Sequence, residues 1–175
     1  MAPVLRRPIA RLALLGVLCA LPALGAARAE GQAPVLSPSG LPLPRFVSLD
    51  ADKVNIRTGP GVRYPIAWVF VRRDMPVEVT AEFDLWRKLR DIDGAGGWAH
   101  KSLLSGRRWA IVTGEVRALH RDPDETSSPV LFAEPGVQGR LVACRRERCK
   151  LEIQGLGGWL KRTQLWGVHP WELFE

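Results

Sequence analysis

The sequence GGWAHKSLL at residues 96–104 recurs 61 positions later as GGWLKRTQL at residues 157–165. Both copies fit the pattern Gly-Gly-Trp-x-x-(Lys/Arg)-(Ser/Thr)-x-Leu. A repeat spaced at the length of one small domain indicates that the chain contains a duplicated unit. The repeated pattern brings no recognisable set of catalytic groups or metal ligands with it. It therefore predicts a binding device rather than an enzyme.

The residues before each copy of this pattern predict short β-strands. Between residues 45 and 112, short runs rich in β-branched and aromatic side chains alternate with turn residues such as Gly59-Pro60-Gly61. In the run Val54-Asn55-Ile56-Arg57, apolar and polar side chains alternate, as they do in a half-buried strand. No convincing amphipathic helix intervenes, and residues 113–175 echo the same order more faintly. The sequence predicts an all-β fold in two small units, which would gain from packing together or from a covalent staple.

Several motifs of the first unit match one known family in type and order. They are Val54-Asn55-Ile56-Arg57-Thr58-Gly59-Pro60, then Tyr64-Pro65, Trp86, and Gly96-Gly97-Trp98 with Leu103-Leu104. On these residues, 45–112 resembles the bacterial SH3-like (SH3b) domain family. Residues 113–175 resemble it less closely, because Arg-Ala-Leu-His at 117–120 replaces the Asn-x-Arg-x-Gly signature. The resemblance implies two tandem SH3-like small β-barrels, used in exported bacterial proteins for attachment to cell-wall material or envelope proteins.

Residues 1–29 have the parts of a signal peptide. A basic start and an apolar run, 12–27, precede a cleavage site of small-x-small form, Ala27-Arg28-Ala29. The run of sixteen apolar residues is shorter than the roughly 20 that a membrane-spanning helix needs. We therefore expect cleavage, no stable membrane span after it, and a periplasmic or secreted protein. The next segment, 30–44, contains four prolines and is expected to be an extended linker.

The charge of the chain gives little support for a nucleic-acid partner. Lys and Arg number 25 against 18 Asp and Glu, a net charge of +7. The predicted leader contains four of the arginines and no Asp or Glu. The rest of the chain therefore carries a net charge of only +3. Nucleic-acid-binding domains usually concentrate positive charge on one face. We expect no nucleic-acid partner.

Two cysteines remain after the predicted leader, which takes Cys19 with it. Cys144 and Cys149 flank a polar four-residue segment, and two thiols in an oxidising compartment usually form a bridge. We expect a disulfide in a hairpin of the second unit. The alternative is a metal site that recruits His120 or His169, but Cys-x4-Cys lacks a second pair of ligands at zinc spacing. We expect neither a metal nor a cofactor.

Seven tryptophans, all after the leader, are the strongest sign of a binding surface. Most are expected to fill the barrel cores, and Trp98 and Trp159 in particular to be structural. The candidate groove residues in the first barrel are Tyr64, Trp68 and Trp86. Beside them Arg57 could hold a carboxylate of a peptide or glycan stem. The alternative is that this arginine pairs within its own domain.

The C-terminal segment 166–175, WGVHPWELFE, is rich in aromatic side chains. If this segment did not pack against the protein, it would expose apolar surface that soluble proteins usually bury. It is expected either to fold back and cap the second barrel or to dock on another protein.

No catalytic arrangement emerges from the sequence. The histidines have no recognisable nucleophile beside them, the serines lack an elbow motif, and paired carboxylates fall in a turn. The sequence therefore predicts a non-enzymatic exported binding module for peptidoglycan or an envelope protein. The alternatives are a structural or adaptor protein of the envelope, or a regulatory fragment of a cell-wall hydrolase.

Overall fold

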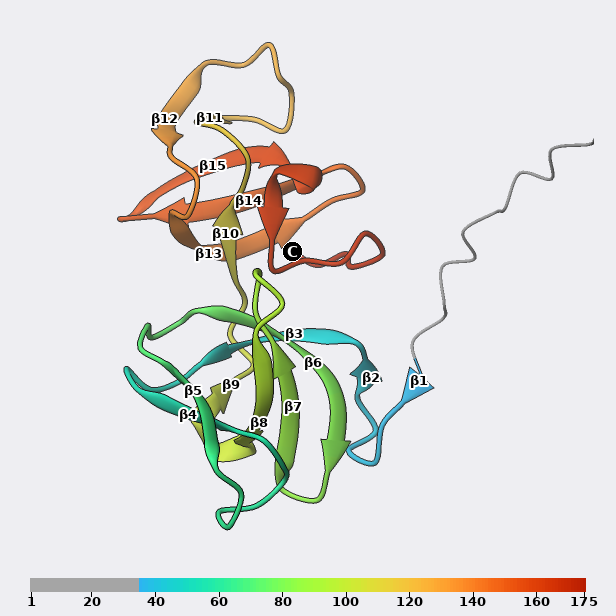
Figure 1. Ribbon diagram of the computed structural model, residues 1–175. Helices are drawn as coiled ribbons and strands as arrows, with labels where there is room; N and C mark the ends of the chain where they lie inside the picture. The colour runs from blue at the N-terminus through green and yellow to red at the C-terminus, as the bar shows by residue number, and fades with distance from the viewer. Residues whose placement is uncertain (1–34) are drawn as a thin grey trace, which may run out of the picture. The chain divides into compact units, whose positions relative to one another are not determined.

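The structure, a computed structural model, describes residues 35–175 (Figure 1). The predicted signal peptide, 1–29, and the start of the predicted linker lie outside the described residues. The part described belongs to one compact unit and is built of antiparallel strands with two short 3-10 helices. None of its helices is long and apolar enough to cross a membrane.

The first barrel is a seven-stranded antiparallel sheet in the order β5-β4-β8-β7-β6-β3-β9. Its strands are β3 (Arg45–Leu49), β4 (Val54–Arg57), β5 (Ile66–Phe70), β6 (Pro76–Phe83), β7 (Trp86–Arg90), β8 (Gly96–His100) and β9 (Leu104–Ser105). The 3-10 helix η1 (Lys101–Leu103) joins β8 to β9.

The second barrel repeats this topology in the order β12-β11-β15-β14-β13-β10-β16. Its strands are β10 (Trp109–Val112), β11 (Arg117–His120), β12 (Pro129–Ala133), β13 (Gln138–Cys144), β14 (Arg148–Ile153), β15 (Leu156–Lys161) and β16 (Leu165–Trp166). The helix η2 (Arg162–Gln164) takes the place of η1. Strand β10 lies before residue 113, where the sequence placed the start of the second unit, yet it pairs with β13 and β16. Strand β10 therefore belongs to the second barrel, and the strands that it pairs with lie far from it in the sequence.

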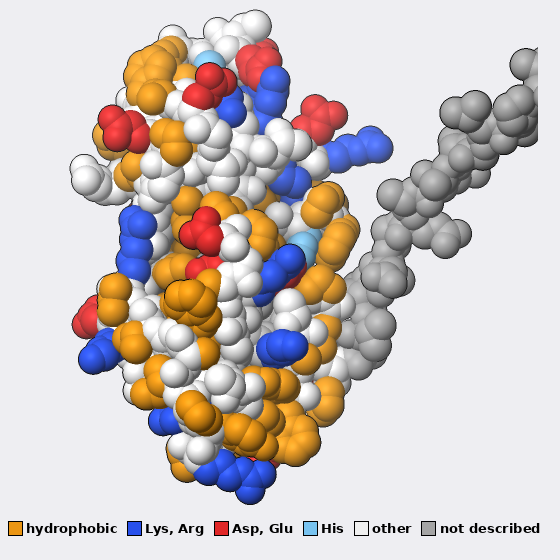
Figure 2. All heavy atoms as spheres, in the orientation of Figure 1, with side chains coloured by type: hydrophobic (Ala, Val, Ile, Leu, Met, Phe, Trp, Pro, Cys, Tyr) orange, Lys and Arg blue, Asp and Glu red, His pale blue; other side chains and the backbone are white. Residues whose placement is uncertain are grey.

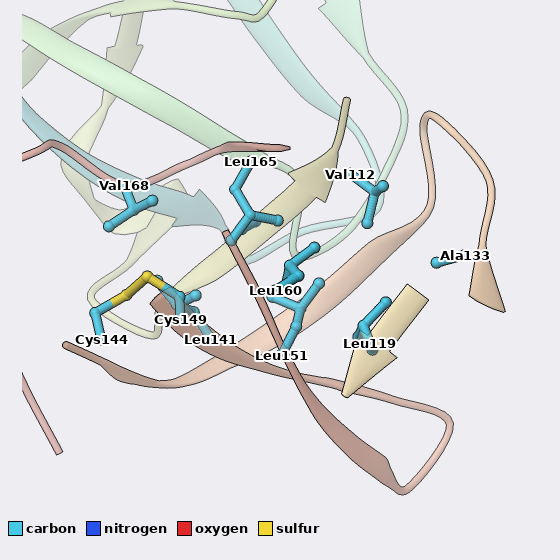
Figure 3. Close-up of a cluster of buried hydrophobic side chains, with 11 residues drawn as sticks. Val112, Leu119, Ala133, Leu141, Cys144, Cys149, Leu151, Leu160, Leu165 and Val168 are labelled. Atoms are coloured by element: carbon cyan, nitrogen blue, oxygen red, sulfur yellow. A yellow bond between two sulfur atoms is a disulfide. The ribbon is translucent and has the colours of Figure 1, made fainter. Parts of the chain in front are cut away.

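Each barrel has its own core. In β4, Val54 and Ile56 are fully buried and Asn55 is exposed, as the alternation predicted. The second core forms around Leu119, Leu151 and Leu160 and includes the two cysteines (Figure 3). Cys144 and Cys149 form a disulfide across the β13–β14 hairpin, with 4.1 Å between their Cα atoms, which confirms the predicted staple.

The glycines of the repeated pattern allow strands to approach closely. Gly97 in β8 has a φ of +154°, and a Cβ atom there would lie 2.4 Å from the carbonyl oxygen of Arg57. At the equivalent Gly158 in β15, a Cβ atom would lie 2.6 Å from the Cβ of Leu119. A larger residue at either position would push β4 from β8 or β11 from β15. This explains the glycine directly before Trp in both copies.

A short hairpin precedes the first barrel in the segment expected to be an extended linker. Strand β1 (Val35–Leu36) pairs with β2 (Pro42–Leu43). The turn between them is fixed to the barrel, because the backbone N–H and the hydroxyl of Ser39 both donate to the carboxylate of Glu82. The proline-rich composition did not reveal this contact, since the partner lies 43 residues away.

The C-terminal segment folds back onto the second barrel. Phe174 forms a backbone bridge with Cys144, and the carboxylate of Glu172 accepts two hydrogen bonds from Arg108, at 2.8 and 2.9 Å. The same region also contacts the first barrel. The ring of Trp166 lies 5.0 Å from that of Phe46 in an edge-on arrangement. Of the two alternatives for this segment, the structure has the one in which it caps the second barrel.

Candidate functional site

Three aromatic side chains form a row across one end of the first barrel. Phe83, Trp86 and His100 are cross-strand neighbours on β6, β7 and β8, because Phe83 pairs with Trp86 and Trp86 pairs with His100. The Trp86 and His100 rings meet edge-on with 5.6 Å between centroids. Phe83 is 59% exposed, and the other two side chains are half-buried. Figure 2 shows exposed hydrophobic side chains over the first barrel.

The β6–β7 hairpin that carries Phe83 and Trp86 is held by buried charges. The side chain of Glu82 is only 1% exposed. Its Oε1 forms ion pairs with Nη2 of Arg45 at 2.6 Å and with Nε of Arg87 at 3.0 Å. Burial raises the pKa of the Glu82 carboxyl, but hydrogen bonds from Arg45, Ser37 and Ser39 outweigh that effect and lower the pKa from 4.5 to about 2. Arg87 also donates to the carbonyl of Asp84 in the turn, at 2.8 Å. This network fixes the turn next to Phe83 and Trp86.

His100 caps the helix that follows it. Its Nδ1 accepts a hydrogen bond from the backbone N–H of Ser102 at 3.3 Å and lies 2.7 Å from the Ser102 hydroxyl. A catalytic serine–histidine pair also needs a group that orients the imidazole. Among the contacts of residues 35–175, none joins Nε2 of His100 to a carboxylate. The contact that the structure shows for this pair is the cap at the start of η1.

The four residues predicted as groove residues fall into three places. Arg57, the last residue of β4, donates to the carbonyl of Tyr64 at 2.8 Å, which joins it to the loop between β4 and β5. The Tyr64 ring covers Gly59, where a Cβ atom would lie 2.5 Å from it. Trp68 is 52% exposed on the edge strand β5, and β4 and β8 separate it from Trp86 on β7. The structure thus brings Arg57 and Tyr64 together but places Trp68 and Trp86 apart.

Two members of the aromatic row, Phe83 and His100, were not among the predicted residues. The sequence signal for Phe83 is the segment Phe-Asp-Leu-Trp at 83–86, in which apolar residues flank a turn. His100 carries no such signal on its own, because its proximity to Trp86 comes from the register of β7 and β8.

The second barrel has charged residues at the equivalent positions. Leu89 pairs with Gly97 in the first barrel, and Leu151 pairs with Gly158 in the second, which aligns β7 with β14 and β8 with β15. In this alignment Trp86 and His100 become Arg148 and Lys161, which are also cross-strand partners. Both cations contact one oxygen of Glu125, each at 2.6 Å. The hydrogen bond from Lys161 is the main cause that lowers the pKa of Glu125.

The described residues offer no constellation for metal chemistry. Residues 35–175 contain no group of three His, Cys, Asp or Glu side chains that could hold a metal ion. The two cysteines are joined to each other, so neither is a free thiolate nucleophile.

The topology, the repeated Gly-Gly-Trp segment and the helix after it define a tandem pair of SH3-like barrels. The family model described as "Bacterial SH3 domain" matches the chain twice, at residues 50–106 and 114–167. The chain therefore belongs to the bacterial SH3 domain family, and the predicted family and fold are confirmed.

The chain also resembles solved structures of longer proteins. The structure of NlpC2 from Trichomonas vaginalis matches with 11% identity and a TM-score of 0.33, over 71% of this chain and 48% of that chain. The structure of NlpC1 from the same organism matches with 13% identity and a TM-score of 0.32, over 75% and 48%. The chain spans about half the length of these two proteins. No protein with a curated description matches it.

Proposed function

We propose that this chain is a non-catalytic binding module of the cell envelope that attaches to peptidoglycan or an envelope protein through the aromatic row Phe83, Trp86 and His100. The observation that carries the proposal is this row, with Phe83 exposed on the fixed β6–β7 hairpin and the half-buried Trp86 and His100 beside it, on a bacterial SH3 domain. Aromatic side chains supply large contact area at low conformational cost, which suits them to binding surfaces. Arg57, Tyr64 and Trp68 stay candidate contacts at other places on the same barrel.

A periplasmic or secreted location agrees with this function. The Cys144–Cys149 disulfide is compatible with an oxidising compartment. The signal-peptide prediction for residues 1–29 points the same way. Wall material and envelope proteins are the partners available there.

Sedimentation with purified cell-wall sacculi tests the proposal. We expect the protein to be retained after a salt wash, and the variants Phe83→Ala and His100→Ala to be retained less. Phe132→Ala is the matched control, because Phe132 is an exposed phenylalanine (68%) on β12 of the second barrel. Recovery of the unmodified protein in the supernatant would favour the adaptor alternative. Turnover of wall fragments by the purified protein would instead support a hydrolase.

A further inference from the structure

A cavity of about 550 Å³ lies at one end of the second barrel. Its lining includes four cations, Arg146, Arg148, Lys161 and Arg162, together with the acid Glu147 and the hydroxyl-bearing Thr163 of η2. These residues come from the hairpin turn, two neighbouring strands and the 3-10 helix. In the first barrel, the same strand positions hold Trp86 and His100. The duplicated barrels therefore present different chemistry at equivalent places.

The two strand cations converge on a single point. Nη2 of Arg148 and Nζ of Lys161 each lie 2.6 Å from Oε1 of Glu125. The Arg148 side chain is only 12% exposed, so it is held in place and loses little further freedom on binding an anion. Charge-assisted hydrogen bonds of this length from arginine and lysine are typical of carboxylate and phosphate recognition.

Glu125 is poorly suited to be a permanent partner of these cations. It lies in the loop between β11 and β12, and its side chain is 54% exposed. Its partner Lys161 is 50% exposed, and ion pairs between exposed side chains are weak. A ligand anion could displace it. Arg146 is exposed, and among the described residues it makes no hydrogen bond or ion pair. Its guanidinium has five donors for such a ligand.

We infer that the second barrel has an oxyanion site for a carboxylate or a phosphate at Arg148 and Lys161, and that the side chain of Glu125 occupies it as an intramolecular stand-in. This site goes beyond the wall attachment proposed for the first barrel and does not depend on it. Ligand binding moves the loop that carries Glu125 away, and Arg146 adds a third cation at the rim.

Titrations followed by backbone amide NMR test the site at constant ionic strength, so that general screening does not change. The probes are acetate, inorganic phosphate and, as the neutral analogue of acetate, acetamide. We expect acetate, phosphate or both to shift the amide signals of Arg148 and Thr163 saturably, and acetamide to leave them unchanged. A response to one anion alone identifies the ligand as a carboxylate or as a phosphate.

Variants separate a ligand site from a structural ion pair. Glu125→Gln removes the stand-in and should tighten anion binding about threefold, the size expected from losing one weak exposed ion pair. Glu115→Gln is the matched control, because Glu115 pairs with Arg117 on the same barrel and does not line the cavity. It should bind as the unmodified protein does.

Lys161→Gln, at a half-exposed position, should weaken binding while the remaining amide spectrum stays that of the folded protein. The inference is overturned if neither anion produces a saturable shift in the unmodified protein. It is equally overturned if Glu125→Gln binds no tighter than Glu115→Gln, or if Lys161→Gln binds as well as the unmodified protein.

Discussion

Glu82 and Arg87 occupy the same cross-strand positions in the first barrel that Cys144 and Cys149 occupy in the second. The two residues of each pair face each other across a hairpin, which is β6–β7 in the first barrel and β13–β14 in the second. The first pair is an ion pair at 3.0 Å, and the second is a disulfide. The duplicated hairpin is thus fastened by charge in one copy and by a covalent bond in the other.

Glu82→Gln should destabilise the first barrel at neutral pH. The substitution removes a buried carboxylate and leaves Arg45 and Arg87 without their counter-ion. From the lowered pKa of about 2 against 4.5, we expect a loss of up to about 3 kcal/mol in the free energy of unfolding. Urea denaturation at pH 7 measures it. Glu152→Gln is the control, because its partner Arg140 is about half exposed, and it should change stability by less than about 1 kcal/mol.

The contribution of Glu82 should also depend on pH with a definite sign. Its folded-state pKa lies below the unfolded value, so its stabilisation is complete above about pH 4.5 and is lost as the pH falls toward 2. The stability difference between Glu82→Gln and the unmodified protein should therefore shrink over that range. Denaturation midpoints at several values of pH measure the difference. A constant difference down to pH 2 would contradict the assigned role.

Removing the disulfide should destabilise the second barrel by about 2 kcal/mol, the chain-entropy estimate for so short a loop. The double variant Cys144→Ala/Cys149→Ala tests this in urea denaturation, and a reductant should have no further effect on it. In the full chain with its three cysteines, thiol titration in denaturant should find one free thiol before reduction and three after it. Three free thiols before reduction would contradict the bridge.

The repeat at residues 96–104 and 157–165 predicted two duplicated units, and the short strand-like runs with the motifs from Val54 to Trp98 predicted their β fold and family. These signals are local, because each depends on residues that are close together in the sequence. The disulfide was predictable for the same reason, since its cysteines flank one hairpin. The Glu82 network was not, because Arg45 and Ser39 lie 37 and 43 residues away along the chain. The same limit applies to the site. Trp86 was identified by its residue type, whereas His100 joins it only through strand register.

Gly97→Ala should be strongly destabilising, because the added Cβ would meet the carbonyl oxygen of Arg57 at 2.4 Å and the backbone φ of +154° disfavours a side chain. Losses of about 2 to 4 kcal/mol are expected when such strain must be relieved by separating strands. Gly106→Ala is the matched control, since a Cβ there meets nothing within 4 Å. Thermal denaturation of the two variants should differ clearly, and equal midpoints would disprove the close approach of β4 and β8.

Glu172→Gln should release the C-terminal segment from the second barrel. The Glu172 carboxylate accepts two hydrogen bonds from Arg108 and one from the backbone N–H of His169. Burial raises the pKa of this carboxyl, but the hydrogen bonds and charge of Arg108, together with the bond from the His169 N–H, outweigh burial and lower the pKa below its usual value. The ionised form is therefore the one that fastens the segment. A neutral amide keeps the shape but loses the charge, which typically costs about 1 to 3 kcal/mol for a charged hydrogen-bonded pair.

Hydrogen exchange measures this release directly. The amide of Phe174, which donates to the carbonyl of Cys144 at 3.1 Å, should exchange faster in Glu172→Gln, whereas amides in the first barrel should keep their rates. Glu134→Gln, at an exposed position of the second barrel, should leave the exchange of Phe174 unchanged. In the unmodified protein the same amide should exchange faster, after correction for the intrinsic rate, once the pH falls below the lowered pKa of Glu172, because protonation removes the charge that holds Arg108. Unchanged protection in Glu172→Gln would mean that the segment is held by its aromatic side chains and not by this ion pair.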